Sequence, residues 1–370
     1  MKKGWTYKSF ADCIDKVSKQ KQVKSKDYKS SGLYPIVSQE KELISGYWDD
    51  ESFLYKHTKP VIIFGDHTKE IKFIDFDFVV GADGTQILSP KEGIDAKFFY
   101  YALKATPLRT LGYARHFKLL KEKSFLIPPF SEQHAIVARL DAAFTKIDAL
   151  KANAEKQLSE ARQLFQAELT ECMRPKEGWE EKTLKELSII AGDYGLNVSS
   201  KPFDGVRYLR ITDITDLGDL NDDKVSANLE NEKKQEELKD GDVLFARTGA
   251  TVGKTLVFRK EFGECLYAGY LIRYRLKKDV ILPRYMHYVT HSNEYYDWVA
   301  TNQAAAAQPN ISAKKYNLLS VRYPFLEDQH RIVSHLDSLS AKVRELEEVQ
   351  RKTMEECDAL KQAMLREVFE

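Results

Sequence analysis

The sequence predicts an α+β fold in which two mixed α/β domains alternate with two long helices that pair as an antiparallel coiled coil. Two observations lead to this prediction: a long internal repeat, and two long segments without proline or glycine that carry a heptad pattern. A chain of 370 residues is also long enough for two domains. The expected segments are a first domain at 1–130, a central helix at 131–174, a second domain at 175–326 and a C-terminal helix at 327–370.

The internal repeat is marked at both ends of each copy. Gly4-Trp5 recurs as Gly178-Trp179, an offset of 174 residues. A Pro-Phe segment followed by Gln-His, Ile-Val and Leu-Asp begins at Pro129 and again at Pro324, and its Gln-His pair is offset by 196 residues. The second copy is therefore 22 residues longer between its markers. Two copies of one unit predict a pseudo-twofold internal repeat.

The two predicted helices carry a coiled-coil pattern. Their apolar or small residues are spaced alternately four and three apart, which is the 3.5-residue period of a heptad seam. Arg174-Pro175 ends the first helix because proline cannot continue the hydrogen-bond ladder. The predicted seam of the first helix is Ile136, Leu140, Ala143, Ile147, Leu150, Ala154, Ala161 and Leu164, with Gln157 filling one position, and that of the second is Ile332, Leu336, Leu339, Val343, Leu346, Gln350, Thr353, Cys357, Leu360 and Met364.

The length of these helices predicts how they pack. A helix of roughly 42 residues is on the order of 60 Å long, too long to be buried around one small domain. Its narrow seam requires one partner helix. The simplest unknotted route returns the second helix antiparallel beside the first, with one domain at each end of the pair. The alternative is that each helix pairs with a different protein.

Both domains are expected to mix strands with short helices, because short apolar runs are punctuated by glycine and proline. The first domain is expected to have strands at 61–64, 72–76 and 78–80 and a helix at 97–105. The second is expected to have strands at 208–211, 242–247, 255–258 and 270–276 and a helix at 284–292.

Three segments resemble catalytic or metal motifs without matching them. Residues 248–255 lack the first P-loop glycine, since Thr248 stands in its place, and a strand is expected to follow. Residues 127–130 read Ile-Pro-Pro-Phe, and Ile127 lacks the hydrogen-bond acceptor that amino-methyltransferases place there for a flipped base. His287 and His291 are four residues apart but lack the Glu of a zinc-protease motif. With four widely separated cysteines and no Cys-x-x-Cys pair, the sequence predicts no metal site and no catalytic residue.

Charge is balanced overall but unevenly distributed. The chain has 57 Lys and Arg against 56 Asp and Glu, a formal net charge of +1, whereas residues 1–30 carry nine lysines. This balance argues against a wholly basic nucleic-acid coat and allows a local one. Without the apolar run of a signal peptide or a membrane span, the chain is expected to be cytoplasmic with reduced thiols.

Over its full length the chain resembles the specificity subunits of Type I restriction–modification systems. The resemblance rests on the duplicated Pro-Phe, Gln-His and Leu-Asp segments that open both long helices. It also rests on Asp-Val-Leu-Phe-Ala-Arg-Thr-Gly-Ala-Thr-Val-Gly-Lys at 242–254. Val-Ile-Ile-Phe-Gly-Asp-His-Thr at 61–68, followed by Asp-Phe-Val-Val-Gly-Ala-Asp-Gly at 77–84, resembles another variant of the same domain.

The resemblance implies a non-catalytic subunit with two target-recognition domains, each of which reads one half of a split sequence in double-stranded DNA. It implies that the helices set the spacing and bind two methyltransferase subunits, and that restriction subunits complete a nuclease. No cofactor is expected on this chain, because S-adenosylmethionine, ATP and Mg²⁺ are expected on the partner subunits.

The candidate DNA-binding residues are polar or cationic side chains in loops and glycine-rich turns, where they can reach phosphates and base edges. In the first domain they are Ser38, Gln39, Lys56, Asp66, His67, Thr68, Lys69, Arg115 and His116. In the second they are Arg210, Arg247, Thr248, Gly249, Thr251, Gly253, Lys254, Gln303, Gln308 and Asn310. Each could instead be an ordinary polar loop residue, and the glycines could serve the turn alone.

Two other interpretations stay open at this point. One is a single-chain nuclease or methyltransferase with its own DNA-binding halves, although the sequence shows no catalytic motif. The other is a coiled-coil scaffold that binds no nucleic acid.

Overall fold

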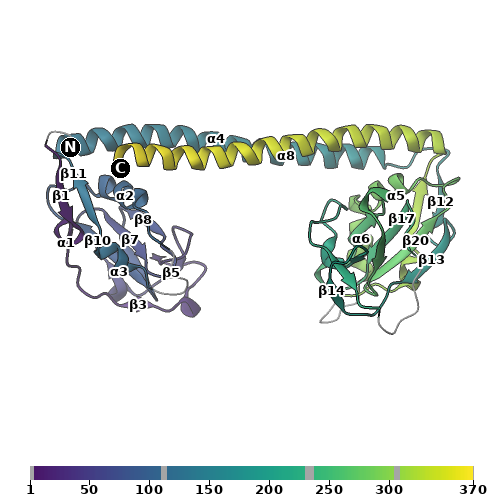
Figure 1. The fold of residues 1–370 in the computed structure, drawn as a ribbon, viewed down its shortest axis with the longest axis horizontal. Coiled ribbons are helices and arrows are strands. Elements are labelled where there is room, and N and C mark those ends of the chain that lie inside the picture. Colours follow the sequence, from purple (N-terminus) through teal and green to yellow (C-terminus); the bar gives the residue numbers. More distant parts are fainter. Residues whose placement is uncertain (1–3, 110–114, 230–236, 304–308, 370) are drawn as a thin grey trace. The chain divides into compact units, whose positions relative to one another are not determined.

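The computed structural model describes residues 4–109, 115–229, 237–303 and 309–369. The chain divides into two compact units, Met1–Glu155 with Gln350–Glu370, and Lys156–Val349. Each unit combines small β-sheets with a part of both long helices (Figure 1). The four-segment division expected from the sequence stays a prediction, because the compact units cut across both long helices.

The first unit contains three small sheets. The strands are β1 (Thr6–Ser9), β2 (Ile14–Asp15), β3 (Gln22–Val23), β4 (Tyr34–Val37), β5 (Gly46–Trp48), β6 (Leu54–Tyr55), β7 (Val61–Gly65), β8 (Ile71–Ile74), β9 (Phe78–Gly81), β10 (Thr85–Pro90) and β11 (Ser124–Ile127). The helices are α1 (Phe10–Cys13), α2 (Ala96–Ala105) and α3 (Phe117–Lys121), with short 3₁₀ turns η1 (Ser25–Asp27) and η2 (Glu51–Phe53). The sheets have the orders β1-β11, β2-β10-β7-β8 and β3-β9-β4-β5, with β6 also paired to β9.

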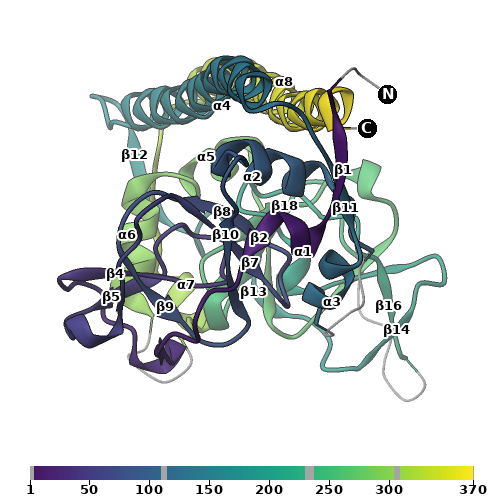
Figure 2. The ribbon, with the colours of Figure 1, turned by 90° about the vertical axis from the view of Figure 1, so that its left-hand side faces the viewer.

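Helix α2 links the β2-β10-β7-β8 sheet of the first unit to the long helices (Figure 2). Asp95 caps its first turn, since the carboxylate accepts a hydrogen bond from Phe98 N at 2.8 Å. Its apolar face packs on the sheet, and the ring of Phe98 lies 5.3 Å from that of Phe369 at the end of the C-terminal helix. One hydrophobic core therefore runs from the sheet into the helix pair of this unit.

The second unit repeats this arrangement around sheets of its own. The strands are β12 (Glu180–Thr183), β13 (Ser188–Tyr194), β14 (Ser200–Pro202), β15 (Arg207–Leu209), β16 (Val225–Ala227), β17 (Asp242–Ala246), β18 (Thr255–Val257), β19 (Cys265–Tyr267), β20 (Leu271–Leu276) and β21 (Ser320–Tyr323). The helices are α5 (Pro283–Val289), α6 (Asn293–Asn302) and α7 (Ala313–Tyr316), with 3₁₀ turns η3 (Ile211–Asp213), η4 (Gly249–Thr251) and η5 (Lys260–Phe262).

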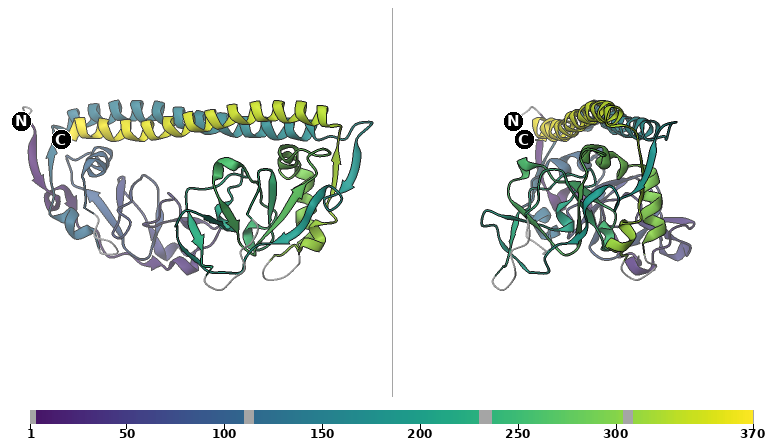
Figure 3. Two further views of the ribbon diagram at one scale, coloured as in Figure 1. Left: turned by 45° about the vertical axis from the view of Figure 1, so that its right-hand side comes forward. Right: turned by 90° about the vertical axis from the view of Figure 1, so that its right-hand side faces the viewer.

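Two sheets of the first unit have counterparts of the same strand order in the second, which confirms the internal repeat. The pair β1-β11 matches β12-β21, and the sheet β2-β10-β7-β8 matches β13-β20-β17-β18. The parallel pairing of β4 with β9 recurs as that of β15 with β19. Helix α5 takes the place of α2 beside the long helices (Figure 3).

The two long helices, α4 (Phe130–Cys172) and α8 (Leu326–Phe369), begin and end within two residues of the predicted bounds. In the first unit Lys151 Nζ lies 2.8 Å from Asp358 Oδ1, and Asp148 pairs with Lys361. In the second unit Arg162 pairs with Glu347 at 2.8 Å. Within each unit, residue numbers rise along α4 as those of their partners fall along α8, so the pairing is antiparallel as predicted.

The exposed fractions of the helix side chains correct part of the predicted seam. Ile136, Leu140, Ile147 and Leu336 are buried, whereas Leu339, Val343 and Leu346 are half-buried. Leu150, Leu164 and Leu360 are 57%, 70% and 51% exposed, so their assignment to the seam was wrong.

The assignment was wrong because a seam with a 3.5-residue period can step by four residues and then three, or by three and then four, and both orders fit the spacing. In α4 the residues one position later, Lys151, Leu158 and Phe165, are half-buried, whereas the predicted Leu150, Gln157 and Leu164 are exposed. In α8 Lys361 takes the place of Leu360, and its ammonium lies 5.3 Å from the centre of the Phe144 ring. The aromatic rings therefore decide the phase, which spacing alone leaves open.

The Gly-Trp marker has the same backbone conformation in both copies. Gly4 and Gly178 have φ of 88° and 86°, in the left-handed region that favours glycine. The turn places Trp5 in the core, where its Nε1 donates to Glu132 Oε1 in the first turn of α4 at 3.0 Å. The marker thus fixes where β1 starts relative to the start of α4.

The glutamine of each Gln-His pair fastens a long helix to its domain. Gln133 Oε1 accepts a hydrogen bond from Asp95 N at 2.7 Å, and its Nε2 donates to the carbonyls of Gly93 and Pro128 at 3.0 and 2.9 Å. Gln329 makes the same three bonds, to Leu282 N and to the carbonyls of Val280 and Pro324, all at 2.9 Å. Both side chains are fully buried.

The aspartate of each Leu-Asp pair makes a second set of hydrogen bonds to the domain, about two turns further along the helix. Asp141 accepts hydrogen bonds from Tyr101 and Lys97, and Asp337 accepts them from Tyr288 and Arg284. Burial, followed by the hydrogen bond to Asp141, raises the pKa of Tyr101, which therefore stays a donor. The repeated sequence motif is thus a repeated junction between a domain and a helix.

Replacement of Gln133 by alanine tests this junction. The variant leaves one buried N–H and two buried carbonyls without their partner. The free energy of unfolding should therefore fall by about 1–3 kcal/mol. Chemical denaturation in urea measures the change. Gln163→Ala, at an exposed position of the same helix, serves as the control and should stay within about 0.5 kcal/mol of the parent. Equal effects of the two substitutions would contradict the junction.

Candidate nucleic-acid interface

In the first unit, the turn that connects β7 to β8 is the centre of a polar cluster. Gly65 ends β7, and a Cβ there would lie 2.2 Å from Thr68 Oγ1 and 2.9 Å from Gln39 Cβ. Glycine therefore allows the segment after β4 to approach the turn closely. Gln39 Oε1 accepts a hydrogen bond from His67 N at 3.0 Å, and Gln39 O accepts one from Thr68 Oγ1 at 2.6 Å.

Asp66 holds the segment before α3 against the same turn. Its backbone carbonyl accepts a hydrogen bond from His116 N at 2.8 Å, and its carboxylate accepts one from Phe117 N at 2.8 Å. Asp66 and His116 are only 3% and 1% exposed, whereas the side chain of Arg115 is 76% exposed. Asp66 and His116 therefore support the cluster, and Arg115 is the residue that it presents to solvent.

The structure thus gathers most of the residues predicted in the first domain, and Lys69 belongs to the same turn with a left-handed φ of 63°. Ser38 adjoins Gln39 but is buried, with its hydroxyl 2.7 Å from that of Ser45. Lys56 follows β6 on a different segment and pairs with Glu51 at 2.6 Å, an interaction that raises the pKa of Lys56. Ser38 has a supporting position, and Lys56 stands apart from the cluster.

In the second unit, Arg247 is the centre of the corresponding cluster. It follows β17, the counterpart of β7, and its guanidinium carbon lies 4.9 Å from the centre of the Tyr194 ring at the end of β13. Arg247 Nε donates to Asn310 Oδ1 at 3.3 Å. Its backbone N–H donates to Tyr270 O at 3.0 Å. Stacking on an aromatic ring orients the planar guanidinium, which suits recognition of phosphates or base edges.

The glycine-rich turn 248–254 connects two antiparallel strands, β17 and β18, and no helix follows it. Gly253 N donates a hydrogen bond to Ala246 O and Lys254 N donates one to Thr251 O, both at 3.0 Å, so these amides are used inside the turn. Gly253 has a φ of 88°, and a Cβ there would lie 2.8 Å from Val299 Cγ1. This segment does not fit a P-loop, whose amides are free to hold phosphates at the start of a helix.

Several residues predicted in this domain have partners or burial that reduce their access to a ligand. Arg210 lies between two carboxylates, 2.7 Å from Asp213 and 2.6 Å from Asp223, and hydrogen bonding to Asp213 raises its pKa further. Lys254 pairs with Asp216 at 2.7 Å. Thr248 is 7% exposed. Thr251 donates to the carbonyl of Thr248, and Gly249 N donates to Pro309 O.

The segment after α6 contributes only part of what was predicted. Asn310 contacts Arg247, and a β-bridge joins it to Thr248. Gln303 ends α6 and is half-buried. Gln308 lies outside the described residues.

A groove of about 480 Å³ lies in this unit and includes Tyr270, whose carbonyl accepts the backbone N–H of Arg247. Asn197, Tyr208, Arg210 and Tyr270 are among the residues that line it, and Tyr270 is 57% exposed. Tyr194 and Tyr270 were missed from the sequence, because tyrosine is common in cores and only the fold places these two beside Arg247. An exposed tyrosine, a stacked guanidinium and an amide are the groups that contact bases and phosphates in nucleic-acid complexes.

Two segments that resembled other functional motifs have structural positions. Ile127 ends β11, is buried, and pairs with Thr6 of β1. His287 and His291 lie on or next to α5, and burial lowers the pKa of both. His291 Nδ1 lies 2.7 Å from the carbonyl of His287, so one ring nitrogen is already used.

Within the described part of the chain, no helix has both the length and the apolar character needed to cross a membrane.

Comparison with known proteins gives concordant results. The family model described as "Type I restriction modification DNA specificity domain" matches residues 2–160 and 176–355. The EcoKI specificity subunit of the Type I restriction enzyme from Escherichia coli strain K12 is 28% identical over 303 residues. That alignment covers 75% of this chain and 64% of the relative. The EcoBI specificity subunit of Escherichia coli is 22% identical over 308 residues, 74% of this chain and 65% of the relative.

A solved structure concerned with complex assembly and conformational transition of the type I R-M system contains a chain of the same fold. The TM-score is 0.70 at 19% sequence identity, over 98% of this chain and 97% of that chain. The alignments with both curated relatives span slightly less than two thirds of their length. Since the family model matches both halves, this chain belongs to the family of Type I restriction–modification DNA specificity domains.

Proposed function

We propose that this chain is a non-catalytic specificity subunit, which binds a two-part sequence in double-stranded DNA and directs adenine methylation or cleavage by partner subunits. The observation that carries the proposal is the duplication of one sheet-and-helix unit with unlike polar clusters. One cluster is built around Gln39, His67 and Arg115, and the other around Arg247, Asn310 and Tyr270. Two related domains with different contact residues suit two different half-sites.

We propose that the paired helices separate the two recognition domains and bind two copies of a methyltransferase subunit. The duplicated junctions support this proposal, since equivalent surfaces are expected to bind equivalent partners. Phe130 and Phe325, at the two helix starts, are 48% and 72% exposed and offer an apolar contact in each copy.

The chemistry is assigned to the partner subunits. S-adenosylmethionine would supply the methyl group, and ATP and Mg²⁺ would serve cleavage, all on partners. The turn 248–254 does not fit a P-loop, and Ile127 offers no acceptor for a flipped base. These features support a chain that reads DNA without acting on it.

Exchange of residues 1–125 for those of another member of the family tests the two-part recognition. Methylated adenines are mapped in the DNA of cells that express the hybrid chain with methyltransferase and restriction subunits. One half of the methylated sequence should change while the other half stays the same. Changes in both halves, or in neither, would refute separate reading by the two domains.

Arg247→Ala should remove the stacked guanidinium and weaken specific DNA binding by roughly 10- to 100-fold, or about 1–3 kcal/mol, with relaxed specificity in the second half-site. Gel-shift titration of the complex with methyltransferase subunits measures the affinity for duplexes altered in one half. Lys185→Ala, an exposed cation in the turn after β12, is the matched control. Equal losses for both variants on all duplexes would mean that Arg247 contributes only general charge.

A further inference from the structure

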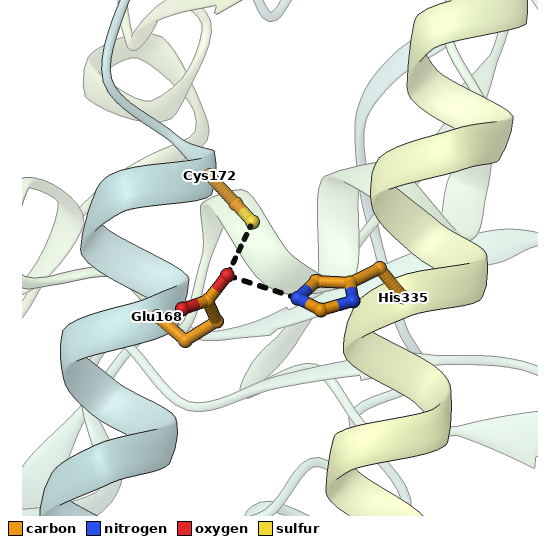
Figure 4. A group of neighbouring side chains, drawn as sticks. All are labelled: Glu168, Cys172 and His335. Carbon is orange, nitrogen blue, oxygen red and sulfur yellow. Dashed lines mark hydrogen bonds and ion pairs between the residues drawn. The ribbon is translucent and has the colours of Figure 1, made fainter.

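Three metal-binding side chains meet where α4 ends beside α8 in the second unit (Figure 4). Glu168 and Cys172 are four residues apart on α4, so they occupy the same face one turn apart. His335 projects toward them from α8. Within the described ranges this is the one group of three such residues whose ligand atoms all lie within 4.8 Å of one another.

The distances are close to those of a tetrahedral zinc site. His335 Nε2 is 2.9 Å from Glu168 Oε1, and Cys172 Sγ is 3.8 Å from the same oxygen. Zinc bonds of about 2.0–2.3 Å at tetrahedral angles separate neighbouring ligand atoms by about 3.3–3.8 Å. Small side-chain rotations, without movement of either helix, therefore bring the three atoms around one ion.

The surroundings suit a site with three protein ligands and one open position. Leu169 and Leu336 are fully buried beside the group, and Phe165, Met173 and Ile332 pack against them. The side chain of His335 is 49% exposed, so water can reach the group from one side. With apolar residues on one side and solvent on the other, a bound ion could be coordinated by three protein ligands and one water molecule.

The internal repeat shows that helix packing does not require these three residue types. At the offset of 196 residues, Arg139 replaces His335, and Met364 and Val368 stand where Glu168 and Cys172 would repeat. Val368 is 7% exposed and belongs to the core of the first unit. The same helix pair is thus built with two apolar residues and an arginine in one copy and with a thiol, an imidazole and a carboxylate in the other.

We propose that Glu168, Cys172 and His335 bind a zinc ion that fastens the end of α4 to α8. A thiolate and an imidazole favour Zn²⁺ over Mg²⁺ or Ca²⁺, which prefer oxygen ligands. The ion replaces the Glu168–His335 contact, and the thiol proton passes to solvent when the Zn–S bond forms. The sequence predicted no metal site because the third ligand lies 163 residues from Cys172. The proposal is independent of DNA recognition.

Titration of the reduced, chelator-treated full chain with Co²⁺ tests the site, because cobalt in such a site gives thiolate charge-transfer absorption. Burial raises the pKa of the Cys172 thiol, so the titration is done at mildly alkaline pH. We expect one Co²⁺ per chain with the charge-transfer band, displaced by Zn²⁺. Cys172→Ala should abolish the band and weaken binding by about 100-fold or more.

The matched control is Cys357→Ala, which removes a buried cysteine of α8 in the first unit and should keep the band. Circular dichroism verifies that each variant is folded. In the parent chain, Zn²⁺ should also protect Cys172 from alkylation, as read by mass spectrometry. Absence of the band in the parent chain, its persistence in Cys172→Ala, or alkylation of Cys172 unaffected by Zn²⁺ would overturn the proposal.

Discussion

The hydrogen bonds of two buried glutamines are the interaction on which the rest of the structure depends. Gln133 and Gln329 each join the first turns of a long helix to a backbone N–H and a carbonyl of the adjoining domain. A third bond, to the proline carbonyl just before the helix, fixes the direction in which the helix leaves the domain. Because a buried amide that loses its partners is costly, these bonds hold the first turns of each long helix firmly against the adjoining domain.

Each polar cluster combines buried residues that support the backbone with exposed residues that face solvent. The buried members, Asp66 and His116 in the first unit and Thr248 in the second, fix backbone positions, whereas Arg115 and Tyr270 are presented to solvent. The corresponding strands β7 and β17 have the same place in their sheets, and the residues that follow them differ. A common scaffold thus presents unlike polar residues, as the proposed recognition of two different half-sites would require.

The repeat, the long helices and the strands 61–64, 242–247 and 255–258 were predictable, because apolar periodicity and chain punctuation report directly on local structure. The phase of the seam was not predictable from spacing. One phase of the 3.5-residue period places Leu150 in the seam and the other places Phe144 there, and the packing of the aromatic rings decides between them. The clusters were predictable where glycine-rich turns marked them, as at Asp66 and Arg247. Tyr194 and Tyr270 could not be found this way, because their position beside Arg247 depends on contacts between distant strands.

The role of the Gln-His pair in the repeated motif could not be predicted from the sequence. A Gln-His pair at a helix start could have been a cap or a surface feature, and only burial shows that the glutamine is the junction. The histidine beside it has a lesser role: His134 is exposed, and its ring meets that of Phe130 edge to face with the ring centres 4.4 Å apart.

The central claim is that the helix pair is the spacer between two DNA-reading domains, and deletion of one heptad from both helices tests it most directly. Removal of residues 151–157 and 347–353 keeps the seam in phase and shortens each helix by about 10 Å, close to the rise of three base pairs. Mapping of methylated adenines in cells with the partner subunits gives the gap between half-sites. The account predicts unchanged half-sites with a changed gap, and methylation at the original gap would contradict it.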